Sequence, residues 1–282
     1  MKVLLAGAFG HLGSDVLKSL VEAKHDVLAV DAVTRELDFD GFTTKKIDLT
    51  DKEAIKGICD GVDVVVTTVG LTKASETLTP YDIDYGANKN LLDEALAAGV
   101  KNFAYVSVLK AEKGSYIPML GAKAKFEKDL KASGIQYCIF RPTGYFYDTA
   151  HIFWPKVRDG KVTLLKTKDP IKCNVIDTKD FGDYIAEHMC DDNKEYDVGG
   201  REEYTYEEIA KMFFEAAGKP AVIKYTPPFM FDLIIKMSPK WKRGVIMFGK
   251  WTMTEDMVAE VHTGKKSFKE YIKEIYEKGY EF

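Results

Sequence analysis

The feature that most constrains the fold is a run of glycines close to the N-terminus of this 282-residue chain. The apolar segment Val3–Ala6 leads directly into a turn of seven residues, and from Leu12 onward apolar residues recur at helical spacing. A strand that enters a helix through a glycine-rich turn gathers backbone N–H groups and the positive end of the helix at one point, where a pyrophosphate can bind. The turn therefore predicts a dinucleotide site, with contacts from Gly7, Ala8, Phe9, Gly10, His11, Leu12 and Gly13.

Each of the three glycines has its own expected role, because none carries a Cβ atom. Gly7 permits the tight turn, and Gly10 lets the backbone approach the phosphates. Gly13 lets the helix pack closely on the strand. We expect His11 to lie beside the phosphates, far from any reacting atom.

An acidic residue at the end of the second strand predicts which dinucleotide is bound. Asp31 follows the strand Val27–Val30 and comes eighteen residues after Gly13, where a carboxylate can accept hydrogen bonds from the adenosine ribose hydroxyls. Because its negative charge repels a 2′-phosphate, NAD is the predicted cofactor. NADP is the alternative, since Arg35 is close enough in sequence to support that phosphate.

Two further turns are expected to reach the cofactor. Asp48 and Leu49 follow a third short strand, in a position to contact the adenine ring, and Asp48 is equally suited to cap a helix. Thr68, Val69 and Gly70 close the strand Val62–Val69 at the carboxyl edge of the sheet, where ligands of such folds bind.

Alternation of short apolar runs with amphipathic stretches predicts an α/β fold with a doubly wound parallel sheet, the Rossmann fold. Further strands are expected at Phe103–Ser107 and Tyr137–Phe140, and a helix at Ala122–Ala132. Beyond Tyr145 the pattern becomes irregular. We expect residues 1–150 to form the dinucleotide-binding domain, with 174–198 returning to it, and 151–173 with 199–282 to form a smaller, interwoven substrate or lid lobe.

Several motifs resemble the atypical short-chain dehydrogenase/reductase superfamily in its NmrA-like branch, and are most similar to divinyl chlorophyllide 8-vinyl-reductase-like proteins. The glycine spacing is the GxxGxxG of that superfamily. The other motifs are Ile83-Asp84-Tyr85, Asn90-Leu91-Leu92-Asp93-Glu94-Ala95, Lys123-Ala124-Lys125-Phe126-Glu127 and Arg141-Pro142-Thr143. The resemblance runs from residue 1 to about residue 235.

The resemblance implies roles for residues in the middle of the chain. Lys123 takes the place of the cofactor-binding and catalytic lysine, which donates hydrogen bonds to the nicotinamide ribose, and Ser107 lies near the nicotinamide. The segment after Arg141 passes the nicotinamide carboxamide and enters the substrate pocket, with Asn174–Asp177 framing the cleft. It contributes Pro142, Thr143, Gly144 and Phe146 to the cofactor and Tyr145 to the substrate.

The chain departs from the superfamily at the proton relay. Met119 stands where the usual catalytic Tyr precedes the lysine by four residues, and Val108 stands near the position of the catalytic Ser. Tyr116 is the remaining candidate for a general acid, provided that it comes within hydrogen-bond reach of the reacting atom.

The leading hypothesis is an NAD(P)-dependent reductase that transfers hydride to a C=C or C=O bond of a small, partly aromatic substrate. Tyr145, His151 and Trp154 are candidate substrate contacts in an aromatic cluster that could equally form the core of the lobe. The alternative is a non-catalytic NmrA-like sensor that binds the dinucleotide and acts through a protein partner. A nucleotide-sugar epimerase would need the missing Tyr.

Composition excludes other classes. A net charge of −4 argues against nucleic-acid binding, and the four scattered cysteines indicate reduced thiols in a cytoplasmic protein without a metal site. No apolar run is long enough to span a bilayer. The Met- and Phe-rich stretch Phe229–Trp251 favours a substrate-lobe helix, with a peripheral membrane contact as the alternative. The oligomeric state has no signature in the sequence.

Overall fold

The computed structural model describes residues 1–71 and 73–279. The chain divides into two compact units, each made of two segments. Unit 1 comprises Met1–Arg141 and Phe181–Tyr196, and unit 2 comprises Pro142–Asp180 and Asp197–Phe282.

The main sheet has, among the described residues, eight strands in the order β12-β9-β6-β5-β4-β1-β2-β3. Those of the N-terminal half are β1 (Lys2–Ala6), β2 (Asp26–Asp31), β3 (Phe42–Lys46), β4 (Val64–Thr67), β5 (Asn102–Val106) and β6 (Gln136–Pro142). The pairs formed by these six strands are parallel, and the order reverses between β1 and β4. This order confirms the expected doubly wound sheet, in which ligands bind beyond the carboxyl ends of the strands at the reversal.

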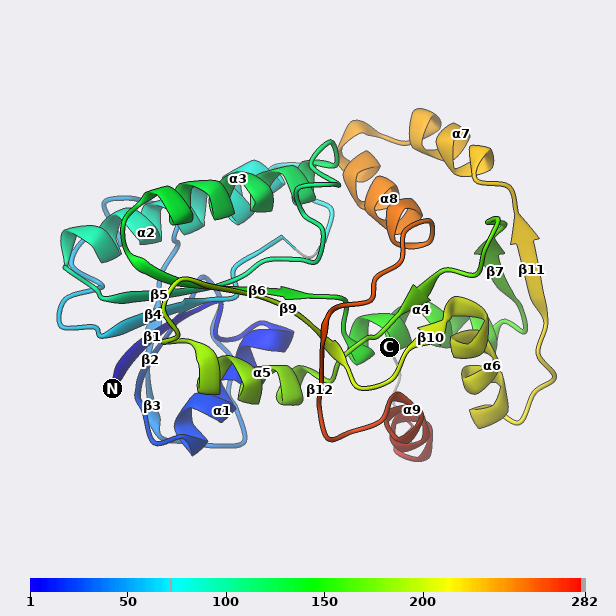
Figure 1. The fold of residues 1–282 in the computed structure, drawn as a ribbon, viewed down its shortest axis with the longest axis horizontal. Coiled ribbons are helices and arrows are strands. Elements are labelled where there is room, and N and C mark those ends of the chain that lie inside the picture. Colours follow the sequence, from blue (N-terminus) through cyan, green and yellow to red (C-terminus); the bar gives the residue numbers. More distant parts are fainter. Residues whose placement is uncertain (72, 280–282) are drawn as a thin grey trace. The chain divides into compact units, whose positions relative to one another are not determined.

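Helices cover both faces of the sheet in unit 1. Figure 1 shows α2 (Asn88–Ala97) and α3 (Pro118–Ala132) on one face, and α1 (His11–Glu22) with α5 (Thr178–His188) on the other. Because both faces are covered, the central strands β1, β4 and β5 are almost continuously apolar, and all four residues of β4 are buried. A one-and-a-half-turn π-helix, η1 (Tyr81–Ala87), precedes α2.

Close packing fixes each helical layer. The rings of Tyr105 on β5 and Phe126 on α3 meet edge to face, with centroids 4.6 Å apart. On the opposite face, a Cβ atom at Gly182 of α5 would lie 3.0 Å from the Asp15 carbonyl oxygen of α1. Ser19 Oγ also donates a 2.8 Å hydrogen bond to Asp183 Oδ1. These contacts hold the strand ends that carry the predicted cofactor residues.

Unit 2 is built from small sheets and a helical layer. In it, β7 (Val162–Leu165) pairs with β11 (Ile223–Thr226), and β8 (Lys172–Cys173) with β10 (Tyr204–Thr205). The second half of β9 (Lys194–Gly200) pairs in parallel with β12 (Val261–Thr263). The helices are α4 (Phe146–Arg158), α6 (Tyr206–Ala216), α7 (Phe229–Met237), α8 (Lys240–Thr252) and α9 (Phe268–Glu277).

An aromatic core joins α4, α6 and α9 of unit 2. The ring of Phe213 lies 5.9 Å from that of Phe153 and 6.0 Å from that of Phe268, measured between centroids. α6 begins with a complete capping box, in which Thr205 Oγ1 accepts from the Glu208 N–H and the Glu208 carboxylate accepts from the Thr205 N–H. In the part of the chain that the structure describes, no helix has the length and hydropathy to cross a bilayer.

Candidate functional site

The glycine turn joins β1 to α1 at the point where the strand order reverses. Gly7 has a φ of +77°, and a Cβ atom there would lie 2.7 Å from Thr68 Oγ1 on the neighbouring strand end. A Cβ atom at Gly13 would lie 1.9 Å from the Gly7 carbonyl oxygen. Both glycines are therefore required by the chain itself, as the turn and the close packing of helix on strand predict.

Gly10 differs from the other two glycines. Its φ of −68° suits any residue. A Cβ atom added at Gly10 would have the Gly7 carbonyl oxygen as its nearest neighbour, at 3.4 Å. The protein thus leaves open space where Gly10 carries no side chain. An approaching ligand gives a physical reason for glycine at this position.

The N-terminus of α1 is prepared for an anion. Gly10 is the N-cap residue, no side chain caps the helix, and no acidic residue lies in its first turn. The first backbone N–H groups of a helix need acceptors from outside the helix. An uncapped start at the switch point of a doubly wound sheet is a favourable site for a phosphate. Of the remaining turn residues, Ala8 and Phe9 are buried, Leu12 is half-buried and His11 is exposed.

Asp31 lies at the end of β2 beside this turn. Its Oδ2 accepts a 3.0 Å hydrogen bond from the Phe9 N–H, and its Oδ1 accepts one of 3.3 Å from the Val33 N–H. The carboxylate is therefore held in place while remaining partly accessible. Arg35 is also ordered near α1, because its Nη2 donates a 3.0 Å hydrogen bond to Ser14 Oγ. Both groups considered for NAD or NADP selection thus lie close to α1.

The turn after β3 is stabilised mainly from within. Asp48 Oδ1 accepts from the N–H of Thr50 at 2.8 Å and from its hydroxyl at 2.7 Å, as a capping residue does. Leu49 is buried, and its carbonyl oxygen accepts a 3.0 Å hydrogen bond from Asn90 Nδ2 of α2.

The end of β4 contacts a buried ion pair. The Lys123 ammonium on α3 lies 3.1 Å from Oδ1 of Asp84, whose side chain is 0% exposed. Asp84 Oδ2 accepts a 3.0 Å hydrogen bond from the Leu71 N–H. A Cβ atom at Gly70 would lie 2.8 Å from Asp84 Oδ1 and 3.2 Å from Lys123 Nζ, so glycine at residue 70 makes room for the pair.

The geometry of this pair leaves bonding capacity. Among the described residues, no donor meets Asp84 Oδ1 with hydrogen-bond geometry, so the lysine compensates this oxygen through charge. Lys123 Nζ also donates to the Val106 carbonyl oxygen at 3.4 Å. An ammonium has three donors, so it can serve a further acceptor beside the carboxyl ends of β4 and β5.

Asn88, one helical turn after Asp84, ties this region together. Its Oδ1 accepts a 2.7 Å hydrogen bond from the buried Thr67 hydroxyl on β4. Its Nδ2 donates to the carbonyl oxygens of Val69 and Asp84 at 3.1 and 2.9 Å. The turn Thr68–Gly70 is therefore held against the π-helix that carries Asp84.

Ser107 belongs to a second polar cluster, at the end of β5. Its buried hydroxyl donates to Glu127 Oε1 on α3, and Arg141 Nη2 lies 2.6 Å from Glu127 Oε2. Arg141 also pairs with Glu195. Partial burial alone would raise the pKa of Glu195, but the hydrogen bond and charge of Arg141 outweigh it and lower that pKa. The Ser107 hydroxyl therefore uses its proton in the hydrogen bond to Glu127, which links the end of β5 to α3.

The three positions that decide the proton relay lie on or next to α3 and after β5. Met119 is on the first turn of α3, one helical turn before Lys123. Tyr116 precedes α3 and is 68% exposed. Val108 follows β5 and is half-buried.

In unit 2, the segment after Arg141 is fixed by hydrogen bonds to Asn174–Ile176. Thr143 is buried, and its Oγ1 donates a 2.7 Å hydrogen bond to the Asn174 carbonyl oxygen. The N–H of Phe146 donates to the Ile176 carbonyl oxygen at 3.0 Å, while the Ile176 N–H donates to that of Gly144 at 2.9 Å. Pro142 is buried as well.

The side chains predicted to contact substrate have different surroundings. Trp154 packs edge to face on Tyr276 with centroids 5.3 Å apart, within the helical layer. Phe146, which was predicted to contact the cofactor, packs on Phe268 at 4.8 Å. His151 is exposed and stacks on Tyr147. Tyr145 occupies the N-cap position of α4 without a capping hydrogen bond from its side chain. Burial raises the pKa of its hydroxyl well above the usual value.

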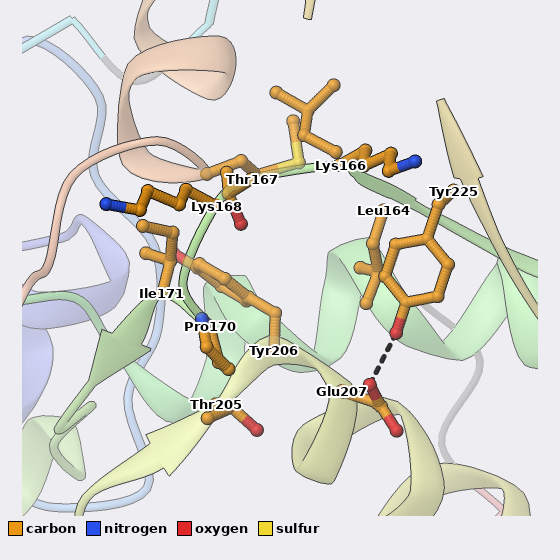
Figure 2. Close-up of a pocket in the computed structure, with 12 residues that line it drawn as sticks. Leu164, Lys166, Thr167, Lys168, Pro170, Ile171, Thr205, Tyr206, Glu207 and Tyr225 are labelled. Atoms are coloured by element: carbon orange, nitrogen blue, oxygen red, sulfur yellow. Dashed lines mark hydrogen bonds between the residues drawn. The ribbon is translucent and has the colours of Figure 1, made fainter. Parts of the chain in front are cut away.

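A cavity of about 480 Å³ lies within unit 2, between β7, β11 and the start of α6. Figure 2 shows Leu164, Ile171 and the ring of Tyr206 on its walls, with Lys166 and Lys168 on the loop that crosses it. The Tyr225 hydroxyl donates to Glu207 Oε2 at one side (Figure 2). The volume is in the range of small-molecule sites, and the lining combines apolar, aromatic and cationic groups. Neither Tyr145 nor His151 nor Trp154 is among its lining residues.

Reasoning from the sequence assigned no role to three polar residues of these clusters. Asp84 and Glu127 stand in the motifs that carry the resemblance, but their partners are distant in sequence. Asn88 follows Asp84 by four residues, a spacing that places the two on one helix face and could have marked them as a pair.

Comparison with known proteins gives relatives that span nearly the whole chain. The chain is 23% identical over 283 residues to the photosystem II assembly factor Ycf39 of Cyanophora paradoxa, covering 98% of this chain and 86% of that protein. It is 25% identical over 269 residues to the chloroplastic divinyl chlorophyllide a 8-vinyl-reductase of Arabidopsis thaliana, covering 83% of this chain and 62% of the plant protein.

Solved structures share the fold. The NADPH complex of the NADPH-dependent quinone oxidoreductase QOR2 from Escherichia coli matches with a TM-score of 0.74 at 19% identity, covering 97% of this chain and 99% of that one. The NmrA-like family matches residues 1–280, which confirms the resemblance of the sequence motifs. This chain therefore belongs to the NmrA-like family.

Proposed function

We propose that this chain binds a nicotinamide dinucleotide at the glycine turn and acts as a reductase, transferring hydride to a C=C or C=O bond of a small, partly aromatic substrate. The observation that carries the proposal is Gly10, a glycine that the chain does not need for its own backbone or packing, placed at the uncapped start of α1. A pyrophosphate at that point explains both features.

NAD is the proposed cofactor. The Asp31 carboxylate is fixed beside the turn by the Phe9 N–H, where it can accept hydrogen bonds from ribose hydroxyls and repels a 2′-phosphate. Arg35 is the group that would favour NADP, and its hydrogen bond to Ser14 keeps it near α1. The quinone oxidoreductase relative is described as NADPH-dependent, so the choice needs a direct measurement.

The bound reduced nicotinamide supplies the hydride from its C4 atom. In this proposal Lys123 donates hydrogen bonds to the ribose hydroxyls, and Asp84 is a positioning residue that sets the location of the lysine ammonium. Ser107 is held by Glu127 and transfers no proton. Tyr116 or solvent donates the proton that, with the hydride, completes reduction of the double bond.

Fluorescence titration with NADH and NADPH tests the cofactor. We expect tighter binding of NADH to the wild type. The Asp31→Ala variant should have a smaller preference for NADH over NADPH. The Arg35→Ala variant should bind NADH as tightly as the wild type does. A clear preference of the wild type for NADPH would overturn the assignment to Asp31.

Turnover is tested by incubating the protein with reduced cofactor and a panel of conjugated enones and quinones, following loss of the reduced-nicotinamide absorbance. Tyr116→Phe should slow turnover if the hydroxyl donates the proton, and should leave the KM for NADH unchanged. Two of the proteins that this chain is similar to are named as reductases, one of a vinyl group and one of quinones, which supports this panel.

A second candidate function is a dinucleotide sensor that acts through a protein partner. It is favoured by Met119 and Val108, which stand where the superfamily's Tyr and Ser would be. Tight binding of NADH without turnover on any compound of the panel would favour the sensor over the reductase.

A further inference from the structure

The helices α7 and α8 of unit 2 form a hairpin that is tied at both ends. At its tip, Arg243 Nε donates a 2.9 Å hydrogen bond to the Ser238 carbonyl oxygen, and its Nη2 donates one of 3.1 Å to that of Lys236. At the open end, Lys250 Nζ pairs with Asp232 Oδ1 at 2.5 Å. Figure 1 shows the two helices packed side by side. The hairpin is therefore a defined element with its own cross-links.

α7 is strongly apolar, yet none of its residues is buried. Its inner face carries Phe231 and Ile235, which are half-buried. Its outer face carries large apolar side chains at the spacing of one helix stripe, and the most exposed of them is Met237 at 77%. The members of this stripe are Met230, Leu233, Ile234 and Met237.

The helix that follows the tip, α8, also exposes large apolar side chains. Trp241 and Val245, one helical turn apart, are both exposed. Monomeric proteins rarely expose large apolar patches to water, and exposed apolar side chains gathered on one short hairpin are typical of binding to a membrane or a partner. We call the outer stripe of α7 together with Trp241 and Val245 the hairpin face.

The charge around the hairpin face favours a membrane over a protein partner. Asp232 is the only acidic residue between Phe229 and Thr252, and it is already paired with Lys250. Lys236, Lys240 and Lys242 surround the tip, and the Lys242 ammonium lies over the Trp241 ring, 4.6 Å from its centroid. This concentration of positive charge occurs in a chain whose net charge is −4.

We propose that the hairpin face docks on the surface of an anionic lipid bilayer. Leu233, Met237 and Trp241 enter the interface between headgroups and acyl chains, and the lysines at the tip contact lipid phosphates. Long lysine side chains suit this role, because their stems lie along apolar surface while the ammonium groups reach the polar layer. The hairpin lies in the interface and does not span the bilayer.

Flotation of the purified 282-residue chain with vesicles tests the proposal. We expect the protein to float with vesicles of phosphatidylcholine mixed with phosphatidylglycerol, and to bind much less to phosphatidylcholine alone. Added salt should release it, since exposed charges are screened. Tryptophan emission should shift to shorter wavelength on binding, and Trp241→Phe should reduce that shift.

Two variants separate the apolar and charged contributions. Leu233→Ser with Met237→Ser should lower vesicle partitioning by about tenfold or more, because both side chains are exposed and would be buried on docking. Lys236→Gln with Lys240→Gln and Lys242→Gln should remove the preference for phosphatidylglycerol. Leu96→Ser changes an exposed leucine on α2 and is the matched control, with wild-type partitioning expected.

Three results would overturn the proposal. The first is that the protein floats with neither kind of vesicle. The second is that the Leu233→Ser/Met237→Ser variant floats as well as the wild type. The third is that light scattering shows a concentration-dependent dimer, which the same variant abolishes, while the protein does not bind vesicles. Each measurement is made without a cofactor, so its outcome is independent of the proposed reductase activity.

Discussion

At the scale of single residues, the ion pair of Asp84 and Lys123 makes the sharpest energetic prediction. Asp84 is fully buried and Lys123 nearly so, and removal of one partner leaves an uncompensated charge. Lys123→Met should lower the free energy of unfolding by about 3 kcal/mol. In a double-mutant cycle with Asp84→Asn, measured by urea unfolding, the coupling should be about 1–3 kcal/mol.

An exposed pair provides the control for that cycle. Lys89 and Asp93 form an ion pair on the surface of α2, and Lys89→Met should change stability by less than about 0.5 kcal/mol. If Lys123→Met costs no more than Lys89→Met, the buried pair does not hold the end of β4 as described.

Residues whose roles depend on local geometry were predictable from the sequence, and those that depend on distant partners were not. The positive φ of Gly7 and the tight packing of Gly13 follow from the order strand, turn, helix. The partner of Lys123 lies 39 positions earlier, on a π-helix that has no periodic signature. Only packing of that helix against α3 brings the two charges together.

At the scale of elements, local sequence signals account for where several helices and strands begin and end. Thr205 and Glu208 have the Thr-x-x-Glu spacing of a capping box, and the capping box is present at the start of α6. α3 begins at Pro118, four residues before the predicted Ala122, because proline is favourable at the first helical position. β4 is shorter than the predicted strand Val62–Val69, because the Val69 N–H bonds to Thr67 Oγ1 instead of the next strand.

The junction of α5 and β9 predicts a pH dependence. The Tyr196 hydroxyl donates to Asp191 Oδ2, and His188 Nδ1 lies 2.9 Å from the same oxygen. The hydrogen bond from Tyr196, followed by that with His188, lowers the pKa of Asp191 below its usual value. A lowered pKa in the folded state stabilises the fold above the unfolded pKa of about 3.9 and loses this effect as the pH falls through the folded value.

Comparison of the wild type with Asp191→Asn tests this sign. The difference in unfolding free energy should be present near neutral pH and should shrink as the pH falls below about 4. Tyr196→Phe should remove part of the pH-dependent difference, since it deletes the main donor. A difference that grows toward acid pH would contradict the assignment.

At the scale of the whole molecule, the alternation of strands and helices was sufficient to predict the doubly wound sheet, because covered parallel strands are apolar on both faces. The unit 2 cavity and the hairpin face could not be predicted in this way. Both depend on which side chains of short, irregular elements remain uncovered, and the apolar pattern of α7 alone is also that of a buried helix.

The central claim, that a dinucleotide occupies the start of α1, is tested most directly by Gly10→Val. The nearest atom to an added Cβ is the Gly7 carbonyl oxygen, at an ordinary contact distance of 3.4 Å, so the variant should keep its fold and unfold within a few degrees of the wild type. Its affinity for NADH, measured by fluorescence titration, should fall by about tenfold or more, because the added groups occupy the phosphate position.

Two further glycine variants serve as controls for the Gly10→Val measurement. Gly249→Ala, at an open position on α8, should leave NADH affinity at the wild-type level and keep or slightly raise stability, because alanine favours a helix more than glycine does. Gly13→Ala should disrupt the fold through its contact with the Gly7 carbonyl oxygen. We expect a folded Gly10→Val protein that has lost NADH binding. A folded Gly10→Val protein that binds NADH as tightly as the wild type would contradict it.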